Sequence, residues 1–431
     1  MYKSKQGLAH IIALALIVMA SLIGCASPQT VDSVAQSSSK PREFVHTVPD
    51  DTRDALTDGN AAFAFELYQH IRDDSNNIFY SPYSISAALA MTYAGARGET
   101  EQQMASTLHY TLPQDNLHPA FNWLDQTLTS RGADAQGQDE GGFRLRIANA
   151  IWGQQNYTFL AEYLDTLARN YGAGLRIVDF EANVEAARQT INAWVSDSTE
   201  ERIVDLIPEG VLDPSTRLVL TNAIYFNAAW RYPFAEHQTA DAPFHLLDGS
   251  DTTVSMMHIS ESYPYAENEN YQAVSIPYDG GELEMVVLLP RESQFAQVEA
   301  GLDVAFVEDI LQSMTPRPVD LGMPRFEFAA DLSLATTLAD MGMPDAFSDA
   351  ADFSGMTGDR ALSISDVLHK AFVLVDESGT EAAAATAVVM KELSIAPGKP
   401  VQMTLDRPFI FFIRDIESGS ILFLGRVVDP S

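Results

Sequence analysis

The residues of this chain that could carry chemistry are nine scattered histidines, one cysteine and many acidic side chains. No histidine has a second one three to five positions further on, so no pair is spaced to hold a metal ion. The sequence also lacks the G-x-S-x-G turn of hydrolases, the H-E-x-x-H zinc helix and the phosphate-binding glycine loops. A Ser-His-Asp triad assembled from distant residues remains an alternative, because triads are defined by geometry. We therefore expect no metal, no cofactor and no enzymatic activity.

The most unusual segment is residues 376–389, which consists mainly of small side chains and contains no proline. By helix propensity alone it would be a helix that starts near Gly379 and Thr380. However, it lacks an apolar stripe for docking and lies between two strand-like segments. Small residues without proline would instead allow it to slide between two strands of an existing sheet. Gly379 could then be the pivot, since glycine is free of the usual φ limits.

Hydrophobic periodicity predicts the elements that must position this segment. Helical patterns cover residues 60–71 and, after Ser81 and Pro82, residues 85–94. Runs rich in β-branched and aromatic residues, bounded by turn residues, predict strands. These runs cover residues 219–226, 284–289, 319–328, 371–375, 408–413 and 421–428. The irregular alternation of the two patterns favours a single α+β domain with large sheets.

Several motifs, in order along the chain, resemble the serpin family from about residue 60 to residue 430. They are Asn-Ile-Phe-Tyr-Ser-Pro at 77–82, Gly-Ala-Arg-Gly-Glu-Thr at 95–100, Thr-Asn-Ala-Ile-Tyr-Phe at 221–226, Ser-Asp-Val-Leu-His-Lys-Ala at 365–371 and Gly-Arg-Val-Val at 425–428. The resemblance implies a metastable α+β fold of three β-sheets and about nine helices with an exposed reactive-centre loop. It also implies a suicide substrate, in which the cleaved loop inserts into a sheet and traps the acyl-enzyme.

In this resemblance, the segment of small residues is the loop hinge. Its members are Glu377, Gly379, Thr380, Glu381, Ala382, Ala383, Ala384, Ala385 and Thr386. Thr380, the first residue to insert, is expected to be exposed until the loop is cut. The usual spacing of seventeen positions from the hinge glutamate gives Leu393–Ser394 as the reactive bond, with Lys391 or Met390 as alternatives. Leucine before the bond indicates a chymotrypsin-like, elastase-like or subtilisin-like serine protease as the partner.

The resemblance also implies a gate beneath the central sheet. Ser81, Ser84, Asn222 and His369 would hold the central strands closed by hydrogen bonds, and Trp230 would pack where the loop enters. Ordinary buried polar structure is the alternative for the first four, and a core aromatic is the alternative for Trp230. The two interpretations are compatible, because a satisfied polar cluster is stabilising and its members can exchange partners.

The amino-terminal residues predict export. Residues 1–24 have the cationic start and apolar run of a secretory signal peptide. The run ends in Leu-Ile-Gly-Cys, which resembles a bacterial lipobox, so that Cys25 would become the lipidated first residue of the mature protein. Residues 25–55 have the composition of a flexible tether, and residues 56–431 would form the serpin domain. The expected location is the cell envelope, at the outer membrane or the cell surface.

A formal net charge of −33 argues against nucleic acid as a partner, because phosphate binding needs clustered lysine and arginine. Lysine is especially scarce: it occurs at positions 3, 5, 40, 370, 391 and 399. Strong salt screens the repulsion between acidic groups, so this composition suits a salt-loving or marine source. A general acidic bias is the alternative.

Two rival functions follow from the same residues. The first is a serpin that does not inhibit and acts as a carrier, chaperone or adhesion module. Such members tend to have bulky, charged or proline residues in the hinge, whereas residues 382–387 contain none, which favours an inhibitor. The second is a hydrolase, which would turn over substrate catalytically and lose no activity when the loop is cut.

Overall fold

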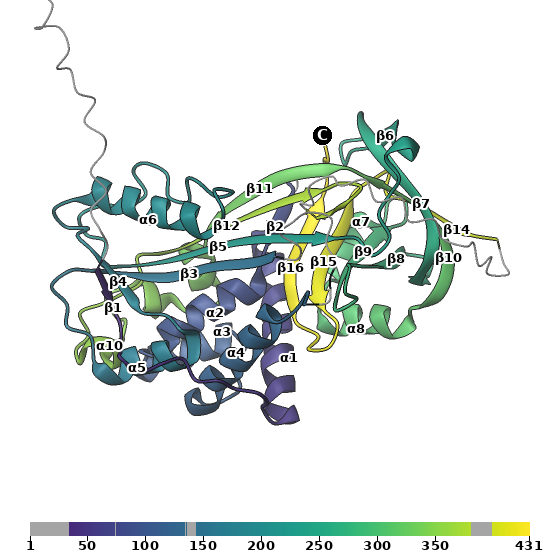
Figure 1. The fold of residues 1–431 in the computed structure, drawn as a ribbon. Helices are drawn as coiled ribbons and strands as arrows, with labels where there is room; N and C mark the ends of the chain where they lie inside the picture. The colour runs from purple at the N-terminus through teal and green to yellow at the C-terminus, as the bar shows by residue number, and fades with distance from the viewer. Residues whose placement is uncertain (1–33, 74, 134, 136–143, 381–398) are drawn as a thin grey trace, which may run out of the picture.

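The computed structural model describes residues 34–73, 75–133, 135, 144–380 and 399–431. In these ranges, ten α-helices and two short 3-10 helices pack against two β-sheets, which confirms the predicted α+β class (Figure 1). The helices are α1 (Asp50–Ile71), α2 (Pro82–Tyr93), α3 (Gly98–Thr107), α4 (Gln114–Thr129), α5 (Ala161–Tyr171), α6 (Val184–Ser198), α7 (Phe295–Ala300), α8 (Val304–Ser313), α9 (Ala335–Met341) and α10 (Ser354–Thr357), with η1 (Glu236–Gln238) and η2 (Pro344–Phe347).

The first sheet has seven strands in the order β1-β4-β3-β5-β13-β12-β11. Their bounds are β1 (Val34–Gln36), β3 (Arg144–Gln154), β4 (Leu175–Val178), β5 (Leu218–Ala229), β11 (Phe326–Ser333), β12 (Asp366–Val375) and β13 (Gly379–Thr380). Figure 1 shows α6 over one face of this sheet and the helices α1 to α4 under the other. Every residue of β5 is buried, because both faces of this central strand are covered.

The two faces of β5 pack into different apolar clusters. Leu220 and Ile224 belong to the main core, which also contains the buried residues of α2. Val219 and Ala223 belong to a second cluster, which contains the buried residues of α6. The strand therefore alternates between two cores with the two-residue period of an extended chain.

The second sheet has nine strands in the order β14-β10-β7-β8-β9-β15-β16-β2, with β6 paired to β7. Their bounds are β2 (Ile78–Tyr80), β6 (Ala240–His245), β7 (Asp251–Glu267), β8 (Tyr271–Pro277), β9 (Leu283–Pro290), β10 (Thr315–Pro324), β14 (Val401–Thr404), β15 (Phe409–Asp415) and β16 (Ile421–Val427). The long strand β7 pairs with β6 and β10 along most of its length and with β8 at its end. The structure therefore has two sheets in its described ranges where the resemblance implied three, and β7 joins the strands of the second one.

Two boundaries differ from the sequence-based predictions. The single strand expected at residues 319–328 is two strands, β10 and β11, which belong to different sheets and are separated at Arg325. The flexible tether expected at residues 25–55 contains regular structure, since β1 and the start of α1 lie within it. The composition of a short segment does not reveal that it pairs with a distant strand, which is the reason for the second difference.

The chain between β1 and α1 is fastened to the helices beneath the large sheet. The guanidinium of Arg42 donates to the side-chain oxygen of Asn122 at 2.8 Å and to the carboxylate of Asp125 at 2.6 Å. The backbone N–H of Glu43 donates to the carbonyl of Arg169 at 2.8 Å. These contacts attach the amino-terminal segment to α4 and α5.

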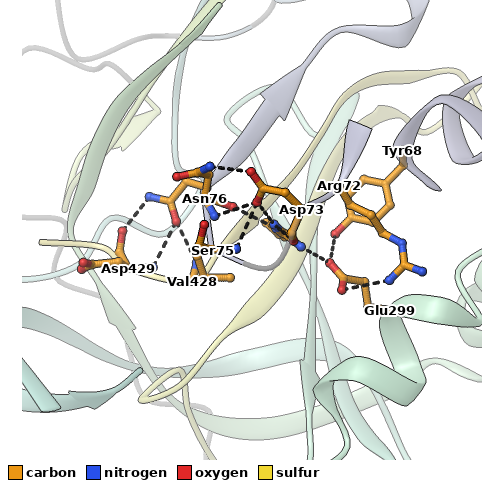
Figure 2. A network of polar contacts seen from close by, with 10 residues as sticks. Tyr68, Arg72, Asp73, Ser75, Asn76, Glu299, Val428 and Asp429 are labelled. Atoms are coloured by element: carbon orange, nitrogen blue, oxygen red, sulfur yellow. Dashed lines mark hydrogen bonds and ion pairs between the residues drawn. The ribbon is translucent and has the colours of Figure 1, made fainter. Parts of the chain in front are cut away.

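A buried ionic network joins the end of α1 to α7 and β16 (Figure 2). The side chain of Arg426 is 1% exposed and donates to the carboxylates of Glu299 at 2.6 Å and Asp73 at 2.9 Å. Glu299 also accepts hydrogen bonds from the hydroxyl of Tyr68 at 2.7 Å and from Arg72 at 3.3 Å. These contacts compensate for the burial of the charges of Arg426 and Glu299.

Candidate functional site

The central strands β5 and β12 are paired along only part of their length. They run parallel and pair from Val219 and Asp366 to Ile224 and Ala371. Beyond this level both strands continue, β5 to Ala229 and β12 to Val375, but their described residues no longer pair with each other. The large sheet is therefore forked at one end.

The short strand β13 lies in this fork. Thr380 pairs with Val375 of β12 and with Ala228 of β5, and Gly379 pairs with Ala229. Both pairings are antiparallel. The first residues of the hinge therefore already occupy the position of a central strand.

Thr380 is buried in this position. Its side chain is 1% exposed, and its hydroxyl lies 2.7 Å from the hydroxyl of Tyr278 in a hydrogen bond. The expectation that Thr380 is exposed before cleavage is wrong. The physical reason is that, within the fork, the backbone N–H and C=O groups of β5 and β12 do not pair with each other. The residues of β13 supply hydrogen-bond partners for them at this end.

Gly379 is required by close packing. A Cβ atom at this position would lie 2.1 Å from the carbonyl oxygen of Ala228 and 2.8 Å from the Cα of Ala229. The sequence suggested that Gly379 is needed for its freedom in φ. Its φ angle lies outside the left-handed region, so this is not the reason for glycine here. Glycine is needed here because the backbones of β13 and β5 approach each other closely.

Glu377 fixes the chain just before β13. Arg325, at the junction of β10 and β11, donates to both carboxylate oxygens, with distances of 2.7 and 2.5 Å. The hydroxyl of Thr239 donates to the same carboxylate. Burial raises the pKa of Glu377, but the hydrogen bonds from Arg325 and Thr239 outweigh this effect, so the pKa lies below its usual value. The carboxylate is therefore ionised, although the residue is only 5% exposed.

Trp230 lies at the mouth of the fork. Its ring is 1% exposed and stacks on Tyr278 with ring centroids 4.7 Å apart. The indole N–H donates to the carbonyl of Asp376 at 3.0 Å, and the backbone N–H donates to the carbonyl of Ser378 at 2.8 Å. Trp230 therefore holds the hinge in place by hydrogen bonds as well as by packing.

His369 bridges the two central strands where they are still paired. It lies opposite Asn222 in the register of β12 and β5, and its Nδ1 hydrogen-bonds to the side-chain oxygen of Asn222. Its Nε2 accepts a hydrogen bond from the backbone N–H of Ser81 at 3.3 Å. Because an amide oxygen only accepts and a backbone N–H only donates, the ring is neutral with its proton on Nδ1.

The same cluster extends beneath β5 to α2 and β3. The amide nitrogen of Asn222 donates to the hydroxyl of Ser84 and to the side-chain oxygen of Asn149. Asn149 in turn donates to the carbonyl of Ser84 at 3.1 Å. The structure thus brings together four residues that the sequence singled out, Ser81, Ser84, Asn222 and His369, and adds Asn149.

Asn149, Arg325 and Tyr278 were missed in the sequence. Asn149 is a single polar residue within strand β3, and no motif around it marks it as a site residue. Arg325 is 52 positions from its partner Glu377. Only the strand registers place these residues at the site. Cys25, residues 381–386 and the bond Leu393–Ser394 lie outside the described residues.

Acid is expected to destabilise the protein through its buried histidines. Burial lowers the pKa of His369 to about 3 and that of His118 to about 4. An unfolded histidine titrates near pH 6.5, so below that pH the unfolded chain takes up protons that the folded chain does not. Each site should remove about 1.4 kcal/mol of stability per pH unit as the pH falls from about 6 to about 4.

Thermal unfolding between about pH 4.5 and 7.5 tests this effect. The variant His369→Gln should lose less stability over this range than the unmodified protein, and His118→Gln serves as the matched variant away from the sheet. Parallel pH curves for His369→Gln and the unmodified protein would contradict the expected role of His369.

Other candidate features are absent from the described ranges. No group of three or more His, Cys, Asp or Glu side chains there is placed to hold a metal ion. No helix in the same ranges is both long and apolar enough to cross a membrane.

The comparisons with known proteins agree with this geometry. The family model described as "Serpin (serine protease inhibitor)" matches residues 58–430. The chain therefore belongs to the serpin family, as its motifs indicated.

Among its relatives, an uncharacterized serpin-like protein of Thermococcus kodakarensis is 40% identical over 91% of this chain and 92% of its own length. Leukocyte elastase inhibitor A of Mus musculus is 40% identical over 87% of this chain and 99% of its own length. Among solved structures, human thyroxine-binding globulin in complex with thyroxine matches with a TM-score of 0.79 at 33% identity, over 88% of this chain and 100% of that chain.

Proposed function

We propose that this protein inhibits serine proteases as a suicide substrate. The observation that carries the proposal is the fork between β5 and β12, with the first two residues of a small-residue segment already paired inside it. A binding protein that uses a static surface needs no such opening. A cleaved loop that becomes a central strand does.

The covalent step uses the chemistry of the protease. Its serine oxygen attacks the carbonyl carbon of Leu393, an ester bond forms, and the Leu393–Ser394 peptide bond breaks. The nitrogen of Ser394 takes the proton and leaves as a new amino terminus. The inhibitor then has to insert its loop before water hydrolyses the ester.

The register of β13 predicts where each inserted residue would lie. Gly379 opposes Ala229 and Thr380 opposes Ala228, so continuing the same antiparallel pairing brings Thr386 opposite Asn222. On the other side, Thr380 opposes Val375, so Thr386 would also oppose His369. Inserting the hinge to this depth would therefore replace the hydrogen bond between Asn222 and His369. This supports a gate function for the polar cluster.

The same register accounts for the small side chains. Thr380 faces the main core, and alternate positions of a strand share a face, so Ala382, Ala384 and Thr386 would also face inward. They would oppose three buried residues of β5, namely Phe226, Ile224 and Asn222. Larger side chains would be overpacked there. Glu381 would point to the opposite face, next to Asn227 of β5.

The reactive bond gives the first test. We expect a one-to-one complex with chymotrypsin, elastase or subtilisin that survives denaturing gels, and a released fragment whose first residue is Ser394. Trypsin is the matched control, because its pocket selects a basic residue. A fragment that starts at Glu392 would move the bait to Lys391. Rapid cleavage of the loop without any complex would instead support a serpin that does not inhibit.

A carrier function is the second candidate, because thyroxine-binding globulin has the same fold. The small side chains at positions 382–387 favour inhibition. A carrier would be cut by each protease without forming a stable complex, and a hydrolase would turn over substrate after its loop is cut.

We also propose that the mature protein is anchored at the cell envelope through a lipid on Cys25, supported by the sequence at its amino terminus. The variant Cys25→Ser is expected to be found in the soluble fraction or to remain unprocessed, because it lacks the atom to which the lipid would be attached. Fractionation of the expressed protein after detergent-free lysis measures this. Equal membrane recovery of the variant and the unmodified protein would exclude the anchor.

A further inference from the structure

The amino-terminal segment enters the large sheet at the end opposite the hinge. Val34 of β1 lies level with Ile177 of β4, and that row continues through Gly153 of β3 to Leu218 of β5. Gly379 lies level with Ala229, eleven residues further along β5, which corresponds to about 36 Å. Figure 1 shows β1 at one end of the molecule and β14, which follows the loop, at the other.

The direction of β1 adds to this separation. Val34 lies level with Leu218 of β5, and Gln36 lies level with Leu220. The strand β1 therefore runs towards the end of the sheet that holds the hinge. The first residue of β1, Val34, consequently lies on the side away from the hinge. Before cleavage, the ends of the loop and the amino-terminal segment lie at opposite ends of the sheet.

Insertion of the cleaved loop would move Leu393, to which the protease is bound, from the hinge end of the sheet to the end where β1 begins. Continuing the register of β13 along β5, Met390 would reach Leu218, the first residue of that strand. Leu393 would lie three residues beyond it, past the end of the sheet where β1 enters. With the loop inserted, the protease would lie at the end of the sheet where β1 begins. We infer that a membrane anchor on the amino-terminal segment competes with the trapped protease for space. This inference rests on the proposed loop insertion and on the proposed lipid on Cys25.

The lengths involved make this competition substantial. Nine residue steps separate Cys25 from Val34, which reach at most about 32 Å and average about 17 Å for a flexible chain. A protease domain of about 200 residues is about 40 Å across. The inserted strand would be four strand spacings from β1, or about 19 Å, which is less than that diameter. The natural segment is therefore too short to keep the membrane clear of a trapped protease unless the body tilts.

Two steps of the reaction should respond differently to anchoring. Attack on the uncut loop takes place at the far end, so its rate should be the same for anchored and soluble protein. Trapping requires the protease to move to the membrane side, so anchoring should slow insertion and give hydrolysis more time. The length of residues 26–33 then sets how much of the anchored inhibitor is wasted as substrate.

The sole cysteine allows a direct test. The mature protein, beginning at Cys25, is coupled through this thiol to a maleimide lipid in phosphatidylcholine vesicles. Three segments are compared: the natural one, one lacking residues 26–33, and one with about 24 added Gly and Ser residues, which roughly doubles its average span. Each protein is also capped with N-ethylmaleimide and assayed in solution. The two readouts are the rate of loop cleavage by chymotrypsin and the ratio of cleaved to trapped inhibitor on denaturing gels.

We expect the three capped proteins to behave alike and the cleavage rates to change by less than about twofold on coupling. On vesicles, the ratio of cleaved to trapped inhibitor should be at least about tenfold higher for the deleted segment than for the extended one, with the natural segment between them. Equal ratios for all three coupled proteins would overturn the inference. Absence of any complex with the capped proteins would instead refute loop insertion itself.

Discussion

Replacing Thr380 with arginine is expected to convert the inhibitor into a substrate. The hinge would have to carry a charged, bulky side chain into a site where Thr380 is 1% exposed and hydrogen-bonded to Tyr278. Burying an unpaired charge costs several kcal/mol. Slowing insertion by about 2.7 kcal/mol reduces its rate about a hundredfold, which lets hydrolysis of the ester proceed first. The protease should be released active, and the loop should be cut at the unchanged bond.

The same substitution is expected to alter the uncut protein, because Thr380 is already inserted. The arginine would displace β13 from the fork and release its pairing with Ala228 and Val375. We therefore expect faster hydrogen exchange of the β13 amides and a lower thermal unfolding midpoint, whereas an exposed Thr380 would have predicted no change.

The matched control is Thr380→Ser, which keeps a neutral hydroxyl within reach of Tyr278. It should inhibit with nearly the original stoichiometry. If Thr380→Arg also forms the covalent complex with unchanged stoichiometry, the protein does not work by inserting the loop through this hinge.

The second large effect is expected from Arg426→Met. This change removes the shorter of the two ion pairs of Glu299, a residue that is 5% exposed, and leaves its carboxylate with Arg72 at 3.3 Å (Figure 2). Breaking a buried ion pair from one side typically costs about 3–5 kcal/mol. For a domain of this size, that corresponds to a fall of about 5 °C in the unfolding midpoint.

A double-variant cycle separates the ion pair from the rest of the network. Glu299→Gln removes the buried charge that Arg426→Met would leave with the longer Arg72 contact, and it keeps an acceptor for Tyr68. The double variant Glu299→Gln with Arg426→Met should therefore be more stable than Arg426→Met alone. Additive losses in the cycle, or a shift of less than about 1 °C for Arg426→Met, would show that the pair contributes little.

Much of the fold could be predicted from local patterns. The β5 region was predicted as a strand because its residues are β-branched or aromatic and apolar, and α2 was predicted from the Ser81-Pro82 start signal. These features depend on residues close together in the chain. The single strand expected at residues 319–328 was wrong because a local strand-like pattern does not reveal that the chain changes sheets at Arg325.

By itself, the sequence determined the α+β class, the serpin family and the small-residue composition of the hinge, because each of these depends on residue types in a fixed order. Only the tertiary structure decided that Thr380 is already buried, that Arg325 holds Glu377, and that Asn149 joins His369 through Asn222. The physical reason is that these contacts depend on strand register. Register brings together residues from β3, β5, β12 and the β10–β11 junction, which no local spacing connects.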